Sequence, residues 1–183
     1  MRARARFFVG LFLVVSLTPA FAQAPGWVLY THPDKLMSVR FPEKPSETDQ
    51  ETPTAIGTIH FKLAMFSNGD RAYVATAVVY PVQGKFDVKK ALDGARDQAL
   101  ANIKGKVISE KPMKLDGFDG RQVLFEASGD DQHHIRGVVR LFASAKPPSA
   151  YMASAMQMTG KPDPDAQKFL DSLHLGKKTE TRP

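Results

Sequence analysis

The sequence predicts an α+β domain in which a single antiparallel β-sheet is flanked by two helices. One long helical pattern, at residues 87–105, has strand patterns on both sides, and a shorter helical pattern at residues 165–173 follows the last strand. The connections between successive strands are too short for a crossover, so we expect the strands to pair antiparallel. Such a sheet needs its apolar face covered, and the amphipathic helices can cover it. The pattern leaves open whether both helices lie on one face or on opposite faces.

The first 22 residues are typical of a secretory signal peptide. Three arginines precede an apolar run at residues 7–17, and a small-residue pattern ends at Ala22. The run is shorter than the roughly 20 apolar residues of a membrane span, and no second such run follows. We therefore predict cleavage after Ala22, a periplasmic or secreted location and no transmembrane segment afterwards; an uncleaved anchor is the alternative.

The mature chain is expected to form one α+β domain at residues 23–176. No repeat and no long linker divides it, and residues 177–183, which lack apolar side chains, are expected to be a disordered tail. The chain has no cysteine, which excludes disulfides, thiolate catalysis and cysteine metal sites. The formal charge of +6 includes three signal arginines, so the mature chain carries 6 − 3 = +3. This weak, dispersed charge argues against nucleic acid as a partner.

Strand patterns fill the chain before the long helix. Residues 27–30 and 36–41 are predicted strands, and residues 55–66 and 72–80 alternate around turn residues and predict a β-hairpin. His32-Pro33-Asp34 is a predicted turn. Residues 43–53 are acidic and polar, and we expect them to form a surface loop.

The long helix has marked ends and one apolar face. Asp87 can accept hydrogen bonds from the first turn, and Gly105 tolerates the left-handed conformation that ends a helix. Gly94 in its middle costs about 1 kcal/mol relative to alanine, so we expect the helix to depend on packing against a sheet. Its expected apolar stripe consists of Val88, Leu92, Ala95, Ala99 and Ile103.

Further strand patterns follow the helix. Residues 107–115 are interrupted by Pro112, which predicts an edge strand or a bulge. The next predicted elements are a tight loop at 116–120, strands at 121–127 and 135–143 around a reversal at 129–132, a strand at 151–159, and the final helix. Asp163 is its expected cap, with Pro164 at the first helical position.

Several segments of the mature chain carry a family resemblance. They are Trp27 and Tyr30 and residues 38–45, 92–97, 102–106, 115–121 and 169–173. Together these segments resemble small exported bacterial proteins of unknown function. The likeness spans nearly the whole mature chain and implies a PsbP-like α/β/α sandwich, with a helix on each side of the sheet. Each matching piece is a strand end, a turn or a helix face, so the resemblance implies no catalytic or binding residue.

Two groups of side chains could bind metal. His133 and His134 lie beside Asp130 and Asp131, but neighbouring strand residues point to opposite faces, and a solvated hairpin turn is the favoured interpretation. Thioethers at residues 152, 156 and 158 share one strand face and could hold Cu(I). Methionine is also a common core filler, and no histidine nearby completes a copper site, so we favour packing.

Charged residues offer two further candidates. Asp116, Asp119 and Arg121 surround two glycines and could support acid–base chemistry, but Asp-Gly is the usual composition of a tight turn. Seven lysines around the long helix could meet an acidic partner or an anionic membrane surface, although a solvated face is the favoured interpretation. These lysines are residues 85, 89, 90, 104, 106, 111 and 114.

The sequence thus contains no nucleophile elbow, phosphate loop or metalloprotease motif. We predict a non-enzymatic binding or accessory module of the cell envelope, with an envelope protein as its partner. We assign no catalytic, cofactor-binding or metal residue and no cofactor. The alternative is an exported protein that binds a small molecule or metal, with enzymatic activity left open; a pocket walled by polar side chains would favour it.

Overall fold

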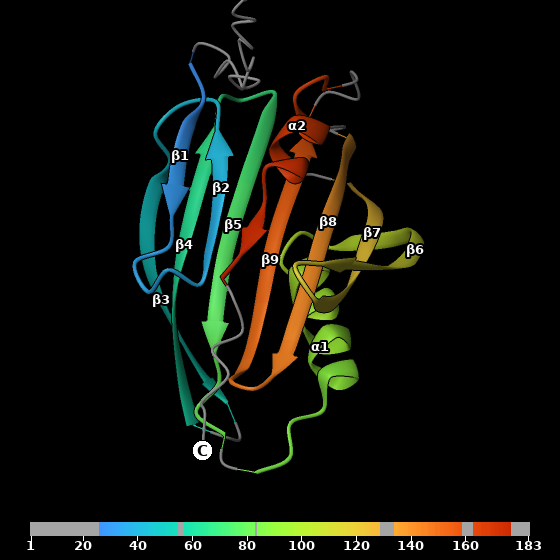
Figure 1. The fold of residues 1–183 in the computed structure, drawn as a ribbon. Coiled ribbons are helices and arrows are strands. Elements are labelled where there is room, and N and C mark those ends of the chain that lie inside the picture. Colours follow the sequence, from blue (N-terminus) through green and yellow to red (C-terminus); the bar gives the residue numbers. More distant parts are fainter. Residues whose placement is uncertain (1–25, 55–56, 83, 129–133, 159–162, 177–183) are drawn as a thin grey trace, which may run out of the picture.

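The computed structural model describes residues 26–54, 57–82, 84–128, 134–158 and 163–176 (Figure 1). The predicted signal peptide, the reversal at 129–132 and the predicted tail lie outside the described residues. The elements are β1 (Val28–Thr31), β2 (Met37–Phe41), β3 (Ser46–Thr54), β4 (Gly57–Ser67), β5 (Arg71–Val79), α1 (Val88–Ala101), β6 (Gly105–Leu115), β7 (Phe118–Ser128), β8 (His134–Ala145), β9 (Pro148–Gln157), α2 (Ala166–Asp171) and β10 (His174–Leu175).

The described strands form two sheets, so the prediction of a single sheet flanked by two helices is wrong. The large sheet has seven strands in the order β3-β4-β5-β9-β8-β7-β6, and the small one has three in the order β1-β2-β10. Every strand pairing among the described residues is antiparallel, as predicted. The molecule is therefore a layered, mostly β structure (Figure 1).

The small sheet packs with α2 on one face of the large sheet. Alternate residues of β2, namely Met37, Val39 and Phe41, are almost completely buried. They share a core with Phe169 and with Tyr73 of β5, whose rings stack at a centroid distance of 4.7 Å. The extra layer exists because β2 finds its partners in β1 and β10 rather than in the large sheet.

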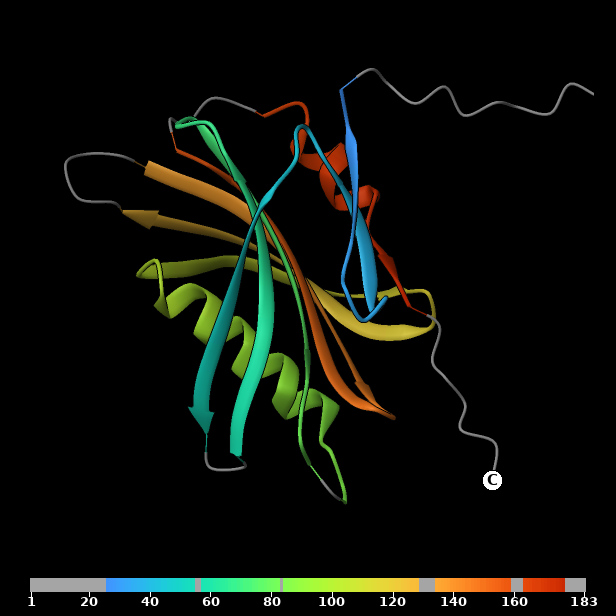
Figure 2. The same cartoon turned by 90° about the vertical axis from the view of Figure 1, so that its left-hand side faces the viewer.

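Helix α1 covers the opposite face of the large sheet, as Figure 2 shows. Its buried residues Leu92 and Leu100 pack against a second core, which includes Phe125 and Leu141. The predicted apolar stripe contained Ala99, whereas the residue that α1 buries at this turn is Leu100. The large sheet is thus the middle layer, with α1 on one side and the small sheet and α2 on the other.

Of the two predicted end signals of α1, the N-terminal cap is confirmed and the C-terminal glycine is not. The Asp87 side chain accepts a hydrogen bond from the Lys90 backbone at 3.1 Å, and this caps the helix. The helix ends at Asn102, however, and Gly105 already belongs to β6. β6 is an edge strand with a register shift after Val107, which confirms the expected edge or bulge. The β6–β7 turn needs only Asp116 and Gly117, both with positive φ.

Two predicted segments near the domain ends need correction. The loop expected at residues 43–53 is wrong, because residues 46–54 form β3 and pair with β4 along their whole length. The sequence pattern of β3 did not indicate a strand because its side chains are mostly polar, and an edge strand has little apolar surface to bury. The final helix is shorter than expected, with Asp165 at the N-cap, and His174 and Leu175 form a strand. The Asp163 side chain accepts from the Asp165 backbone at 3.0 Å, just before that cap.

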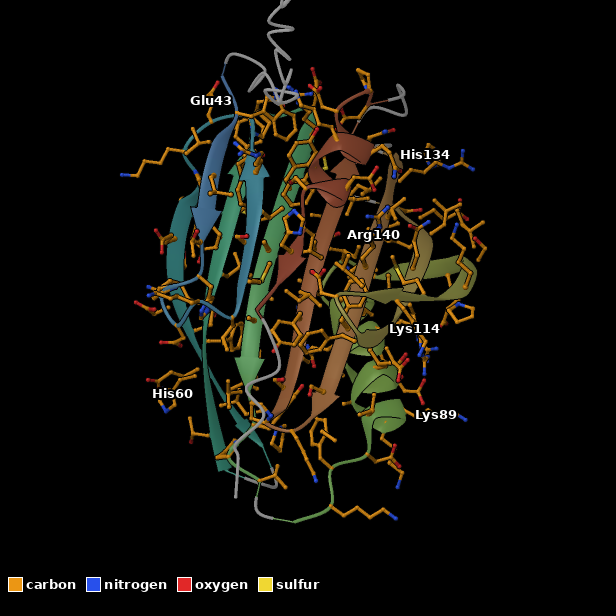
Figure 3. All side chains as sticks on the ribbon, in the orientation of Figure 1. Glu43, His60, Lys89, Lys114, His134 and Arg140 are labelled. Atoms are coloured by element: carbon orange, nitrogen blue, oxygen red, sulfur yellow. The ribbon has the colours of Figure 1, made fainter. Side chains whose placement is uncertain are left out.

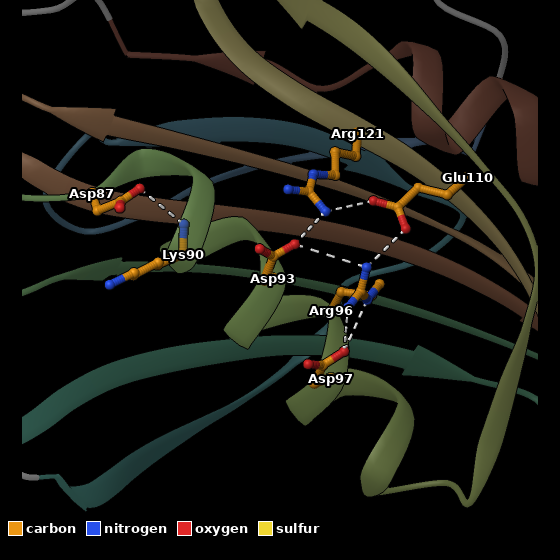
Figure 4. Close-up of polar contacts among 7 residues, drawn as sticks. All are labelled: Asp87, Lys90, Asp93, Arg96, Asp97, Glu110 and Arg121. Carbon is orange, nitrogen blue, oxygen red and sulfur yellow. Dashed lines mark hydrogen bonds and ion pairs between the residues drawn. The ribbon is translucent and has the colours of Figure 1, made fainter.

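Arginines fasten both helices to the large sheet. Arg121 of β7 donates to Asp93 of α1 and to Glu110 of β6, each at 2.6 Å (Figure 4). Arg96 of α1 also reaches Glu110, at 2.9 Å, so two arginines share this carboxylate. On the other face, the buried Arg140 donates to the Leu170 carbonyl at 2.8 Å and to Asp171 at 2.9 Å. No helix in the described part of the chain is long and apolar enough to cross a membrane.

Candidate functional site: a groove between the two sheets

A groove of about 450 Å³ lies between the β1–β2 turn and the neighbouring ends of β3, β4 and β5. This volume falls within the range of roughly 300–1,000 Å³ that is usual for small-molecule sites. The turn forms one wall and the large sheet the other. The lining residues are His32, Pro33, Asp34, Leu36, Asp49, Gln50, Glu51, His60, Phe61, Lys62, Ala77 and Val79.

The groove exists because the inner face of β4 changes character along the strand. Side chains two apart share a face, so Ala64, Lys62 and His60 follow one another on the side of the small sheet. Ala64 is fully buried in the shared core, whereas His60 is exposed. The small sheet therefore covers the apolar end of β4 and leaves its polar end open. Figure 3 shows His60 near the lower end of this strand.

Carboxylates from β3 lie opposite these basic residues. Asp49 pairs with Lys62 across the strands, and its Oδ1 lies 2.7 Å from the Lys62 ammonium. This hydrogen bond raises the pKa of Lys62 above its usual value. Glu51 lies opposite His60, with its Oε1 3.0 Å from Nδ1. With Asp34 from the turn, the lining contains three carboxylates against one lysine, so the groove is mainly anionic.

His32 is the buried polar residue of the groove, with only 5% of its surface exposed. Its Nδ1 accepts a hydrogen bond from the Asp34 backbone at 3.2 Å, so in the neutral ring the proton lies on Nε2. That Nε2 is buried and has no hydrogen-bond partner among the described residues. Burial lowers the pKa of His32, and the charge of Lys62 acts in the same direction against the opposing carboxylates of Asp34 and Glu47.

Tyr30 repeats this situation two residues earlier on the same face of β1. It is 7% exposed, and its hydroxyl also has no partner within the described ranges. Burial, together with the charges of Glu47 and Asp49, raises the pKa of Tyr30 to about 12. Tyr30 on the inner face of β1 and His32 just after this strand thus place two polar groups near the charged residues of β3.

The composition of the groove suits binding better than covalent catalysis. The described residues that line it include no serine, threonine or cysteine to act as a nucleophile. Lys62 and the carboxylate of Asp49 form an ion pair, and this pairing satisfies both groups. What remains is a buried hydrogen-bond donor, an anionic rim and apolar walls.

A second hollow, of about 360 Å³, lies on the opposite face beside the first turns of α1. Tyr80 and Phe86 form its apolar part, with ring centroids 5.2 Å apart, and burial raises the pKa of Tyr80. Its charged residues, Lys85, Asp87 and Lys90, belong to the entry of α1, and Asp87 is already used as the helix cap. This hollow therefore offers fewer specific contacts than the groove.

Only part of the metal-binding candidates from the sequence lies within the described residues. Asp130, Asp131 and His133 lie outside the described residues, and His134 is exposed at the start of β8. Met152 and Met156 are half-buried against the core under α1, which is the expected packing role, and Met158 follows the end of β9. Within the described ranges, no three histidine, aspartate or glutamate side chains are placed to hold a metal ion.

The acidic turn has structural contacts. Asp116 accepts a hydrogen bond from the Leu175 backbone at 2.8 Å, and Asp119 pairs with Lys114 at 2.7 Å. Arg121 points to Asp93 and Glu110 beside α1 (Figure 4). The turn interpretation of Asp116 and Asp119 is thus supported by the partners that they have.

Sequence reasoning missed Tyr30 and His32. Their spacing of two residues in an extended segment was a usable signal, because it places both polar tips on one side, away from Leu29. What the spacing could not show is that both tips lack partners. That depends on which strands of the large sheet lie opposite.

No family model matches the chain, and no curated protein matches it either. The resemblance to small exported proteins with a PsbP-like fold accordingly stays a sequence-based prediction.

Proposed function

We propose that the protein is an exported, non-catalytic binding module that holds a small organic ligand in the groove between its two sheets. The observation that carries this proposal is His32, a residue of the groove wall whose Nε2–H is buried and has no partner among the described residues. Export is supported by the signal-like pattern of the first 22 residues.

The energetic argument concerns the unpartnered donor. Leaving a buried N–H without a partner costs about 1–3 kcal/mol, and a fold rarely keeps such a group without a use for it. A phenylalanine at position 32 would avoid the orphaned Nε2–H, but the Asp34 N–H would then lose the acceptor that Nδ1 provides. A ligand oxygen that accepts from Nε2 would remove the penalty, so part of the binding free energy would come from satisfying His32.

The same geometry favours a ligand over a protein as the main occupant. The groove is concave and narrow, and its polar groups converge from the β1–β2 turn, β3 and β4. Small-molecule sites combine apolar walls with a few such convergent groups. An envelope protein that receives or delivers the ligand would dock around the rim.

The test is NMR spectroscopy of the histidine rings. The ¹⁵N-labelled protein is titrated with fractionated small molecules from a bacterial envelope extract, and ring ¹H–¹⁵N correlations are recorded. We expect at least one fraction to shift the Nε2 signal of His32 while the backbone amides of Lys85 and Lys90, beside the second hollow, stay in place. If every fraction leaves His32 unchanged, or if shifts gather beside α1, the groove is not the binding site.

Export has its own measurement. Fractionation of a bacterium that expresses the full chain, followed by N-terminal sequencing, should yield periplasmic or secreted material that begins at Gln23. An intact Met1 on that material would contradict cleavage.

A further inference from the structure

We infer that the groove takes a primary amine that carries an apolar side chain and a neutral carbonyl oxygen, as in the N-terminal residue of a peptide. This inference rests on the proposed function and specifies its ligand. Each of the three chemical features corresponds to a separate feature of the lining.

The positive charge follows from the carboxylates. Asp34, Asp49 and Glu51 line the groove, and Lys62 neutralises only Asp49 within hydrogen-bond distance. Glu51 is partnered by His60, a residue that contributes a full charge only when protonated. An ammonium group at this rim would gain attraction from Glu51 and Asp34, whereas an anion would be repelled by them.

The apolar body follows from the walls. Pro33 and Leu36 of the turn face Ala77 and Val79 of β5 across the groove. Ala77 is 2% exposed, and its small side chain leaves space above the sheet. A hydrophobic side chain of the ligand would fill this space and bury Val79, which is 43% exposed in the structure.

The carbonyl oxygen follows from His32. Because Nδ1 accepts from the Asp34 backbone, Nε2 is the donor, and its partner must be an acceptor. A carboxylate could accept as well, but Asp34 and Glu51 would repel its charge. A neutral amide or ester oxygen satisfies both conditions. Nε2 is covered in the structure, so the β1–β2 turn must shift to open it to the ligand while Nδ1 keeps its hydrogen bond to the Asp34 backbone.

The experiment compares four related probes by calorimetry with the purified protein. Phenylalaninamide has the amine, the apolar ring and the neutral carbonyl; N-acetylphenylalaninamide lacks the charge, phenethylamine lacks the carbonyl, and phenylalanine replaces it with a carboxylate. We expect phenylalaninamide to bind tightest. Loss of the charge should weaken binding about tenfold, and so should loss of the carbonyl. A tenfold change in Kd corresponds to the free energy of about one such hydrogen bond.

Two variants locate the effect. His32→Asn keeps an acceptor near the Nδ1 position and removes the Nε2 donor, so it should abolish the preference for phenylalaninamide over phenethylamine. Glu51→Gln removes one carboxylate and should weaken phenylalaninamide about fivefold, as for a partly exposed ion pair. Glu43→Gln is the matched control, because Glu43 is exposed near the opposite end of the molecule from His60 (Figure 3).

The outcomes separate the two proposals. Equal binding of phenylalaninamide and phenethylamine, or of the amine and its acetylated form, would contradict the ligand class. If no probe binds while an envelope fraction still shifts His32, the groove is a site for another chemistry and only this inference fails. If neither probe nor fraction acts on His32, the proposed function fails too. Should His32→Asn not fold, the exposed Glu51→Gln still decides the charge requirement.

Discussion

The buried tyrosines Tyr30 and Tyr73 differ in whether the hydroxyl has a hydrogen-bond partner. Tyr73 is fully buried and donates to the Asp163 carboxylate at 2.6 Å, whereas the Tyr30 hydroxyl has no partner in the described part of the chain. Both side chains lie in the core between the sheets. The pair therefore measures what a satisfied and an unsatisfied hydroxyl contribute in the same environment.

We expect Tyr30→Phe to leave the free energy of unfolding unchanged or to raise it by up to about 1 kcal/mol, because it removes an orphaned polar group. Tyr73→Phe should lower it by about 1–2 kcal/mol, because Asp163 loses a hydrogen bond. Urea unfolding of both variants provides the measurement. A clear loss of stability in Tyr30→Phe would show that its hydroxyl has a partner, such as an ordered water molecule.

The buried His32 predicts a pH dependence. Its pKa is lowered from 6.5 in the folded state, so between the two pKa values the unfolded chain binds more protons. The stability from neutral His32 is thus complete above pH 6.5 and is lost as the pH falls below it. The charged groups that act on the ring are Asp34, Glu47 and Lys62.

The measurement is the free energy of unfolding from pH 7.5 to pH 5.5, for the wild type and for His32→Asn. We expect the decline of the wild type to be steeper, since the variant lacks the titrating ring. Parallel curves would mean that other groups cause the pH dependence.

At this scale, sequence reasoning located individual caps and turns better than polar partners. Asp87 was recognised as a helix cap because capping depends only on residues a few positions away. The contacts of Arg121 with Asp93 and of Arg140 with Leu170 span 28 and 30 residues, and no local pattern predicts them. The same holds for the absent partners of Tyr30 and His32.

At the scale of elements, α1 depends on its arginine contacts as well as on its apolar stripe. Arg121 is 15% exposed and reaches carboxylates on α1 and β6, so it ties the helix to two strands. Its hydrogen bond lowers the pKa of Asp93. Gly94, which weakens the helix, lies beside Asp93 and next to this anchor.

We predict that Arg121→Met lowers the free energy of unfolding by about 1–2 kcal/mol, because Glu110 keeps only Arg96 and Asp93 keeps only a more distant cation. Lys114→Met is the control, since its pair with Asp119 is 77% and 66% exposed and should contribute little. Hydrogen exchange of the α1 amides should accelerate in the first variant alone. Equal effects of both substitutions would contradict an anchoring role for Arg121.

Element prediction succeeded where a segment has one clear apolar face. The hairpin predicted at 55–66 and 72–80 is β4 and β5, and the long helix is α1. β3 was missed because its residues are polar on both faces and contain Pro53, which is tolerated at a sheet edge. β10 has only two residues, too few to give any alternation.

At the scale of the molecule, the two cores lie on opposite faces of the large sheet. One contains Phe169 and Phe41, with ring centroids 5.1 Å apart, and the other contains Leu92. The described residues form one layered unit, but the side chains of the two cores do not mix. Substitutions on different faces should therefore act independently.

We predict that Phe169→Leu and Leu92→Val add in the double variant to within about 0.5 kcal/mol, whereas Phe169→Leu and Phe41→Leu deviate from additivity by about 0.5 kcal/mol or more. Each single substitution should cost roughly 1 kcal/mol. Urea unfolding of the three single and two double variants tests this. Strong coupling between Phe169 and Leu92 would show that the large sheet transmits changes between its faces.

The second sheet is the largest feature that the sequence did not reveal. The pattern correctly indicated antiparallel strands and the long helix α1, but it contained no signal for which strands pair. The pairing between β2 and β10 joins Ser38 to His174, and no local pattern around either residue predicts this contact.

This closure has a consequence for the order of events when the chain is made. β2 lies between β1 and β10, so the layer over Tyr73 stays incomplete until Leu175 has left the ribosome. A growing chain would carry Met37, Val39 and Phe41 uncovered for most of its synthesis. The amino-terminal strands can therefore reach their final packing only once the chain has been made as far as β10.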